Sequence, residues 1–245
     1  IPLARQLVSL SLKTEEMMET LRNEVHGHLI IGCSTTPGKY ILPVLLADFM
    51  RQYPRVQATC SVHPRITALE LLEQGKVHFA VSSSSEEFDQ NIEFRQFISD
   101  PVVLIAPLNH PWSKRDEIEP DELLNAQFIL REDTAGTYRV ARSGLAQLGI
   151  NICDLQAILT VGNSEAIAIA VQQGVGVGFV SQMVFAHMVA GRVAQVKVRG
   201  LKMDQHIYLC RHRLQPTGNV QTAFWEFSNP TDSPAMQALV QPRPE

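Results

Sequence analysis

The fold class of this 245-residue chain is decided by one stretch, His28 to Ser82, which reads HLIIGCSTTPGKYILPVLLADFMRQYPRVQATCSVHPRITALELLEQGKVHFAVS. Short apolar runs alternate in it with amphipathic segments, the pattern of a parallel sheet with crossover helices. The expected elements are strand His28 to Cys33, helix Gly38 to Gln52, strand Gln57 to Val62, helix Ile66 to Gln74 and strand Phe79 to Ser82. This order predicts one Rossmann-like lobe.

The same alternation returns farther along the chain. Two strands, Ile92 to Phe97 and Val102 to Ala106, lead into a connection over residues 107–120 that is rich in proline and charge. A second series then follows: strand Gln127 to Leu130, helix Tyr138 to Leu148, strand Ala157 to Val161, helix Ser164 to Gln173, strand Gly178 to Ser181, helix Met183 to Ala190, strand Gln205 to Arg211 and helix Gly218 to Asn229. We therefore predict an α/β protein with two similarly built lobes.

The ends of the chain carry different patterns. Apolar residues recur at heptad spacing near the start, at Leu3, Leu7, Leu10, Met17 and Leu21, and the chain begins at Ile1 without a helix cap. We expect residues 1–26 to be the end of a longer linker helix, so that the sequence is a fragment. Residues 27–104 plus 207–232 are assigned to lobe I, residues 105–206 to lobe II, and residues 233–245 to a loose tail.

Composition excludes several classes of protein. The formal net charge is −4 and the Lys and Arg residues are dispersed, whereas a nucleic-acid reader needs a basic face. No apolar run approaches the roughly 18 residues of a membrane span, and the start does not read as a signal peptide. Four cysteines, Cys33, Cys60, Cys153 and Cys210, stand far apart in apolar or strand-like runs, which favours free buried thiols. We expect a cytoplasmic protein.

Hydroxyl groups gather where strands give way to helices. In open α/β sheets ligands bind beyond the carboxyl ends of the strands, where helix N-termini offer free N–H groups to an anion. The candidate ligand-binding residues are Ser34, Thr35, Thr36, Arg65, Ser82 and Ser83 in the first lobe, and Thr134, Gly136, Thr137 and Ser164 in the second. Ser and Thr are also ordinary helix caps, and an arginine at a turn is often a solvated surface residue, so a structural role stays open for each.

Signatures of catalysis are missing from the sequence. It has no GxSxG, HExxH or Walker motif, and its eight histidines are scattered. The glycine-rich run over residues 174–178 precedes a strand instead of opening a helix, so it is not a nucleotide fingerprint. We expect no catalytic residue, cofactor or metal site.

Several motifs, in order, resemble those of one family. They are Leu29-Ile30-Ile31-Gly32 before Ser34-Thr35-Thr36, Leu42-Pro43, Phe49 to Pro54, Leu72 to Val81, Val103 to Pro107, Asn109-His110-Pro111-Trp112 and Ala170 to Val180. Over nearly its whole length the chain resembles the effector-binding region of LysR-type transcriptional regulators. Phe128 to Glu132 with Gly136, Thr137 and Arg139 is similar to the branch that includes carbon-fixation and cysteine-metabolism regulators, although Ala135 and Tyr138 depart from its commoner residues.

This resemblance implies a fold like that of periplasmic solute-binding proteins, with crossover strands around Pro101 to Ala106 and Gln205 to Arg211. It also implies a dimer of this domain, a tetramer of the intact protein, and a DNA-binding winged helix-turn-helix before Ile1. The expected function is to bind a small anionic effector, a carboxylate, phosphate or sulfate, between the lobes and so alter the geometry of the oligomer.

Two other classes of protein share this kind of scaffold. One alternative is the solute-binding protein of a transporter, which predicts a monomer. The other is an enzyme, such as a relative of porphobilinogen deaminase or prephenate dehydratase. The enzyme would need a reactive cysteine or a threonine-rich motif, and Cys33 and Cys60 lie in predicted strands where we expect burial.

Overall fold

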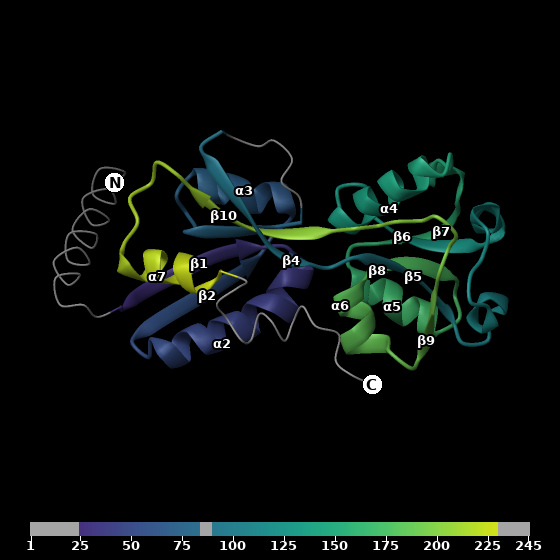
Figure 1. Cartoon of the computed structure of the whole chain (residues 1–245), viewed down its shortest axis with the longest axis horizontal. Helices are drawn as coiled ribbons and strands as arrows, with labels where there is room; N and C mark the ends of the chain where they lie inside the picture. Colours follow the sequence, from purple (N-terminus) through teal and green to yellow (C-terminus); the bar gives the residue numbers. More distant parts are fainter. Residues whose placement is uncertain (1–24, 84–89, 230–245) are drawn as a thin grey trace. The chain divides into compact units, whose positions relative to one another are not determined.

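The computed structural model describes residues 25–83 and 90–229, and the chain divides into two compact units. Unit 1 comprises residues up to Ile98 and from Tyr208 onward, and unit 2 is the continuous stretch Ser99–Ile207 (Figure 1). The predicted linker helix over 1–26, apart from its last two residues, and the predicted tail over 233–245 lie outside the described residues. The boundary predicted between residues 104 and 105 would fall inside strand β5 (Val102–Pro107), whereas this strand lies wholly in unit 2.

Unit 1 is built on a five-stranded mixed sheet in the order β2-β1-β3-β10-β4. Its strands are β1 (Gly27–Cys33), β2 (Val56–Val62), β3 (Phe79–Ser82), β4 (Ile92–Ser99) and β10 (His206–His212). Strand β1 runs parallel to both β2 and β3, while β10 is antiparallel to β3. Cys33 lies level with Val62 on one side and with Val81 on the other, so the three parallel strands end together.

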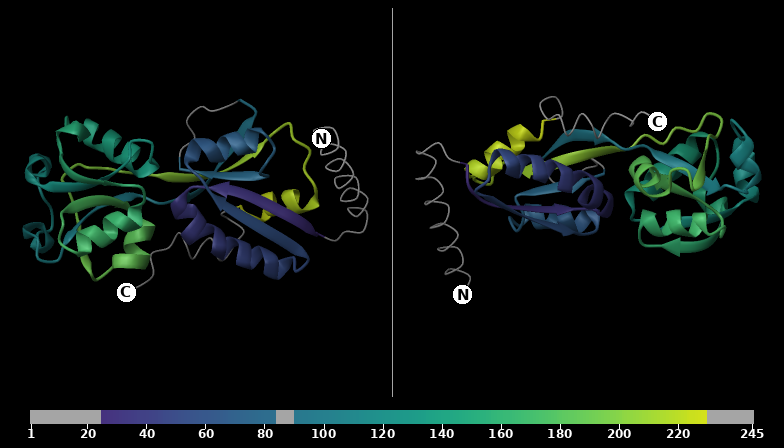
Figure 2. Two further views of the ribbon diagram at one scale, coloured as in Figure 1. Left: turned by 180° about the vertical axis from the view of Figure 1, so that it is seen from behind. Right: turned by 90° about the horizontal axis from the view of Figure 1, so that it is seen from below.

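Helices cover both faces of this sheet. A π-helical turn η1 (Pro37–Ile41) leads into α2 (Leu42–Gln52), which shares a face with α7 (Asn219–Phe227), since the rings of Phe49 and Phe224 lie 5.2 Å apart. Helix α3 (Arg65–Glu73) lies on the opposite face, where Leu69 and Leu72 pack in one cluster with Ala80 and Cys210 (Figure 2). The alternation of Leu29 and Ile31 with Ile30 and Gly32 distributes β1 between these two layers.

Unit 2 repeats this plan with the order β7-β6-β8-β5-β9. Its other strands are β6 (Gln127–Arg131), β7 (Gln156–Val161), β8 (Val177–Ser181) and β9 (Val193–Val196). Its helical elements are the 3-10 turns η2 (Pro111–Lys114), η3 (Pro120–Asn125) and η4 (Ile152–Asp154), helices α4 (Gly136–Gln147), α5 (Ser164–Gln172) and α6 (Gln182–Val184), and the π-helical turn η5 (Phe185–Val189). Phe128 and Phe179 pack with Leu145 under α4, and Gly178 makes room for Ile167 of α5.

The α/β class, with two similarly built units, is confirmed. Each predicted strand and helix within the described residues is present, with bounds shifted by a few residues. The helix predicted from Gly38 begins earlier, because Pro37 starts a π-helical turn instead of forming a boundary. The four-residue edge strand β9 was not predicted, since Val193–Val196 alternates too briefly to stand out.

The cysteines correct one expectation. All four are free thiols, and Cys33 and Cys210 are buried, but Cys60 and Cys153 are exposed. Cys60 lies on the edge strand β2 and Cys153 on the 3-10 turn η4, so neither position has a second layer over it. Within residues 25–83 and 90–229, no helix has the length and apolar character to cross a membrane.

Candidate functional site

In unit 1, the predicted ligand-binding residues lie at the carboxyl ends of three neighbouring strands. Ser34, Thr35 and Thr36 follow β1 and are half-buried, and Arg65 opens α3 after β2. Ser82 is the last residue of β3, 1% exposed, and half-buried Ser83 follows it. The register of β1 with β2 and β3 therefore brings these residues to one edge of the sheet, as their spacing predicted.

In unit 2, the predicted residues lie at the start of two helices. Gly136 and Thr137 are the first residues of α4, and Ser164 is the first residue of α5. Thr137 is 7% and Ser164 1% exposed, whereas Thr134 is exposed in the turn before α4. Helix N-termini carry partial positive charge, so the two helices together favour an anion near these hydroxyls.

Arg131 belongs to this group, although the sequence analysis did not select it. It ends β6, and its Nη1 donates to the hydroxyl of Ser164 at 3.3 Å. Its Nε and Nη2 donate to the two carboxylate oxygens of Glu132 at 2.9 and 2.7 Å. Burial acts to raise the pKa of Glu132, but its hydrogen bonds and the charge of Arg131 outweigh it, so that pKa lies below its ordinary value. The signal in the sequence was an arginine at the carboxyl end of a buried apolar run.

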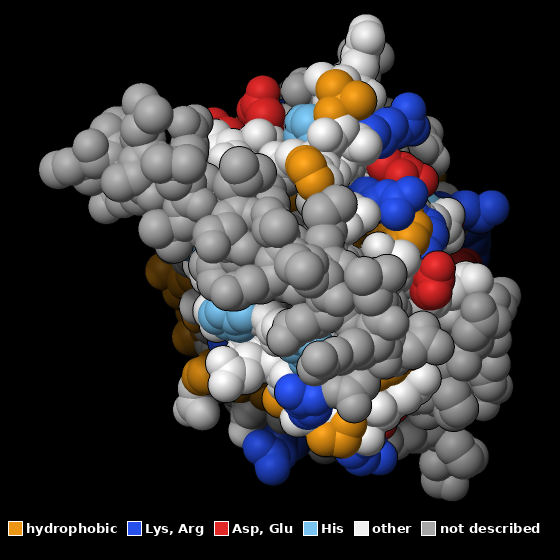
Figure 3. Space-filling view, turned by 90° about the vertical axis from the view of Figure 1, so that its left-hand side faces the viewer, with side chains coloured by type: hydrophobic (Ala, Val, Ile, Leu, Met, Phe, Trp, Pro, Cys, Tyr) orange, Lys and Arg blue, Asp and Glu red, His pale blue; other side chains and the backbone are white. Residues whose placement is uncertain are grey.

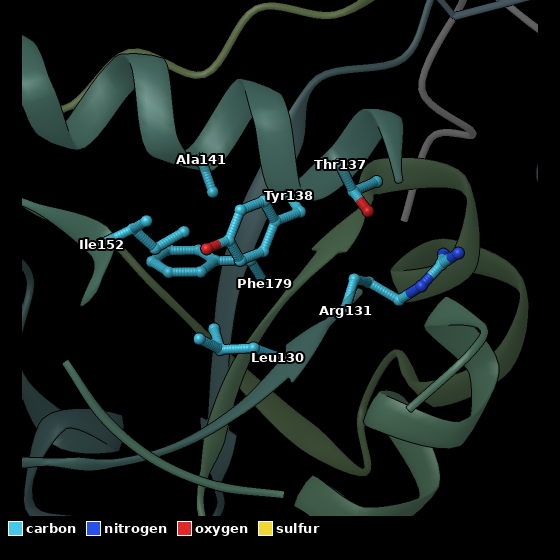
Figure 4. Close-up of a pocket in the computed structure, with 7 residues that line it drawn as sticks. All are labelled: Leu130, Arg131, Thr137, Tyr138, Ala141, Ile152 and Phe179. Atoms are coloured by element: carbon cyan, nitrogen blue, oxygen red, sulfur yellow. The ribbon is translucent and has the colours of Figure 1, made fainter. Parts of the chain in front are cut away.

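Among these groups, the buried hydroxyl of Thr137 still needs a hydrogen-bond partner. Its Oγ1 is buried and, among the described residues, has no hydrogen-bond partner. Figure 4 shows this oxygen pointing toward the Arg131 side chain, while Tyr138, Ile152 and Phe179 gather on the apolar side of a small cavity of about 10 Å³. Because a buried hydroxyl without a partner is costly, this position is suited to a ligand or a water molecule that would accept its hydrogen bond.

The caps of the two helices explain why these hydroxyls are available. Asn163 caps α5, since its Oδ1 accepts the N–H of Ala166 at 2.7 Å, and the neighbouring Ser164 is left to interact with Arg131. Ala135 stands at the cap position of α4, and no side chain in the described part of the chain caps this helix there. The first N–H groups of α4 therefore lack the partner that Ser, Thr, Asp or Asn would supply.

A larger groove of about 380 Å³ adjoins this cavity in unit 2, and the two share Arg131, Tyr138 and Ile152 among their lining residues. It is lined by Leu130, Arg131, Glu132, Asp133, Tyr138, Ile152, Cys153, Leu155, Ala157 and Thr160. Its volume suits a small molecule. The carboxylates of Glu132 and Asp133 in this groove repel an anionic ligand. The side of Arg131 that faces Thr137 and Ser164 is therefore the more favourable one for negative charge.

The thiols in the described strands are poorly suited to nucleophilic chemistry. Burial, aided by the nearby Cys60, raises the pKa of Cys33 to about 12, and partial desolvation of its thiol raises the pKa of Cys60, although this residue is exposed. Burial likewise raises the pKa of Cys210, against the charge of Arg65. A reactive cysteine requires the opposite shift. No cluster of three or more metal-ligating side chains occurs in residues 25–83 and 90–229.

One face of the molecule is shown in Figure 3, viewed from the side on which α7 lies in Figure 1. Lys and Arg side chains on it lie beside Asp, Glu and hydrophobic side chains. This mixture differs from the continuous basic surface that contacts to nucleic-acid phosphates require.

Comparison with known proteins assigns the family. The sequence pattern of the LysR substrate binding domain matches residues 22–231. The chain belongs to this family. The assignment confirms the resemblance found in the sequence, and it favours a regulator over the solute-binding protein of a transporter.

Relatives of this LysR domain are transcriptional regulators. The HTH-type transcriptional regulator MJ0300 of Methanocaldococcus jannaschii, itself described as uncharacterized, is 27% identical over 91% of this chain and 75% of its own length. Probable RuBisCO transcriptional regulators of Cyanidium caldarium and Nostoc are 31% and 30% identical over 72% and 74% of this chain. The matched region spans only 56% and 54% of those two proteins. Regulators named for carbon fixation are thus among its relatives, as the residues around Phe128 to Arg139 predicted.

Solved LysR-type domains share the fold. The effector-binding domain of QuiR in complex with shikimate is 21% identical, with a TM-score of 0.75 over 85% of this chain and 98% of that one. The regulatory domain of Synechocystis CcmR in complex with 2-PG is also 21% identical, with a TM-score of 0.75 over 90% of this chain and 100% of that one.

Proposed function

We propose that this LysR domain senses a small anionic metabolite and performs no chemistry on it. The observation that carries the proposal is the group formed by Arg131, Thr137 and Ser164 at the N-termini of α4 and α5. It combines a guanidinium, a buried hydroxyl with no partner among the described residues, and uncapped N–H groups. These groups bind and orient an anion, but they include no nucleophile paired with a base.

The chemistry of the ligand follows from these donors. A guanidinium presents more N–H groups than Glu132 and Ser164 use, and it matches the planar oxygen pairs of a carboxylate or the oxygens of a phosphate or sulfate. The QuiR effector-binding domain is solved in complex with shikimate and the CcmR regulatory domain in complex with 2-PG, which supports a small-molecule ligand here. The residues at the strand ends of unit 1, with Arg65 and Ser82 among them, form the second set of proposed contacts. That one ligand contacts both sets, and thereby alters oligomer geometry, stays a prediction.

We also propose that a second copy of this chain is a partner. Each unit has large apolar side chains exposed on or next to an edge strand: Val62 and Ile66 in unit 1, which are 52% and 48% exposed, and Ile158 and Ile169 in unit 2, which are 46% and 49% exposed. Exposed edges of this kind pair with another chain or must be protected. In the intact regulator, a cytoplasmic tetramer would bind promoter DNA through a winged helix-turn-helix before Ile1.

The proposed anion site is tested by titration calorimetry of the chain with shikimate, 2-PG and sulfate. We expect Arg131→Gln to weaken binding of the ligand that binds best by about 10- to 100-fold, because a charge-assisted hydrogen bond contributes about 1.5 to 3 kcal/mol. Arg142→Gln is the matched control, since Arg142 is an exposed arginine on α4, away from the start of this helix. Equal affinities for wild type and Arg131→Gln would show that the site is wrong.

A further inference from the structure

Asp100 is a buried carboxylate where the chain enters unit 2. It is 1% exposed and lies between β4 and β5. Its Oδ1 accepts the N–H of Met183 at 3.0 Å, and the hydroxyl of Ser181, the residue before α6, also donates to it. The Asp100 side chain therefore links the entering segment to the start of α6.

The backbone around Asp100 joins three segments of unit 2. The N–H of Asp100 donates to the carbonyl of Gln205 at 2.9 Å, and Gln205 directly precedes β10, by which the chain returns to unit 1. The carbonyl of Pro101 accepts the N–H of Gln182 at 2.8 Å. The two segments that connect the units are thus hydrogen-bonded to each other and to α6, within two residues of Asp100.

The carboxylate is incompletely paired. Its Oδ2 is buried and accepts no hydrogen bond from the described residues. Burial raises the pKa of Asp100 to about 6, against the opposing effects of the Met183 N–H, the Ser181 hydroxyl and the charge of His187. His187, on η5, is the one titratable side chain in the described part of the chain that acts on Asp100, and its Nδ1 lies 2.9 Å from the carbonyl of Met183.

We propose that Asp100 is a pH-dependent switch at the two chain passages: protonated, it keeps the entering segment closed against α6, and ionised, it favours local opening of this segment. Opening would bring the charged carboxylate into water, where ionisation carries no penalty. The proposal is independent of the anion site, because it uses none of the residues placed there.

The direction of the effect follows from linkage. A carboxyl group with a pKa of about 6 in the closed state and about 3.9 in the opened state stabilises the closed state fully below about pH 3.9. This contribution is lost as the pH rises through 6. The equilibrium between closed and opened states then shifts toward opening by up to about 100-fold, and by about tenfold if the difference in pKa is one unit.

The switch is tested by amide hydrogen exchange at Gln182 and Met183 from about pH 5 to about pH 8, with rates divided by the intrinsic rates of the same amides. We expect protection in wild type to fall by about tenfold over this range, because the rest of the total shift occurs below about pH 5. Asp100→Asn keeps an oxygen acceptor but cannot ionise, so its protection should stay constant. His187→Gln should retain the fall.

Two outcomes would overturn the proposal. One is an unchanged pH dependence in Asp100→Asn, and the other is its loss in His187→Gln alone, which would assign the titration to the histidine. Should Asp100→Asn fail to fold, the carboxyl carbon shift of Asp100 in the wild-type chain decides the matter by nuclear magnetic resonance. Titration near pH 6 supports the switch, and a midpoint at or below about 4 excludes it.

Discussion

In both units three parallel strands are followed in the sheet by an antiparallel one, but the arginine near the strand ends is supplied differently in each unit. In unit 1 the arginine, Arg65, opens a helix, whereas in unit 2 Arg131 ends a strand and is held by Glu132 and Ser164. The cap Asn163 in unit 2 leaves the next hydroxyl for the arginine. A shared topology therefore fixes where ligand groups gather, while the residues beside each helix cap decide which of these groups are available to a ligand.

Charged substitutions at the exposed apolar edges are expected to have the largest effect, which is on self-association. We expect Ile169→Lys in unit 2 and Ile66→Lys in unit 1 each to weaken self-association by more than about 30-fold, since a buried charge costs about 2 kcal/mol or more at an interface. Sedimentation velocity of each variant measures this. Lys substitution at the exposed Thr222 on α7 is the control. A monomeric wild type at high concentration, or dimers unaffected by both changes, would contradict the proposed partner.

The two sets of hydroxyls are compared by removing one from each unit. We expect Thr137→Val to stabilise the ligand-free chain by about 1 kcal/mol, because it removes a buried hydroxyl that lacks a partner, and yet to weaken binding of the anion several-fold. Thr35→Val, at a half-buried position, should change stability by less than about 0.5 kcal/mol. Denaturant unfolding and calorimetry measure both quantities. A loss of stability in Thr137→Val would mean that the hydroxyl has a partner within the protein.

The cap of α5 gives the smallest effect. Asn163→Ala should cost about 1 kcal/mol of stability through the lost bond to the Ala166 N–H. Affinity for the anion should change little if the hydroxyl of Ser164 stays with Arg131. A large loss of affinity with unchanged unfolding would instead make Asn163 a direct ligand contact.

Much of the fold was predictable because its strands are short apolar runs that end at glycine, proline or hydroxyl residues. The ends of β1, β3 and β6 were placed within a residue or two on this basis. The role of Arg131 was not predictable, because it depends on Ser164, which lies 33 residues away, and on whether Glu132 turns toward it. The exposure of Cys60 likewise depends on the position of β2 at the edge of its sheet, which local pattern does not specify.

The pairing of the two chain passages bears on how such a protein could be assembled from parts. Unit 2 is one uninterrupted stretch, and its ends lie side by side, where the Asp100 N–H meets the Gln205 carbonyl and the Val102 N–H meets the Met203 carbonyl, both at 2.9 Å. A module with adjacent ends can be excised from a gene or grafted into a host loop without stretching the recipient. Residues 99–207 are therefore a natural cassette for building chimeric sensors.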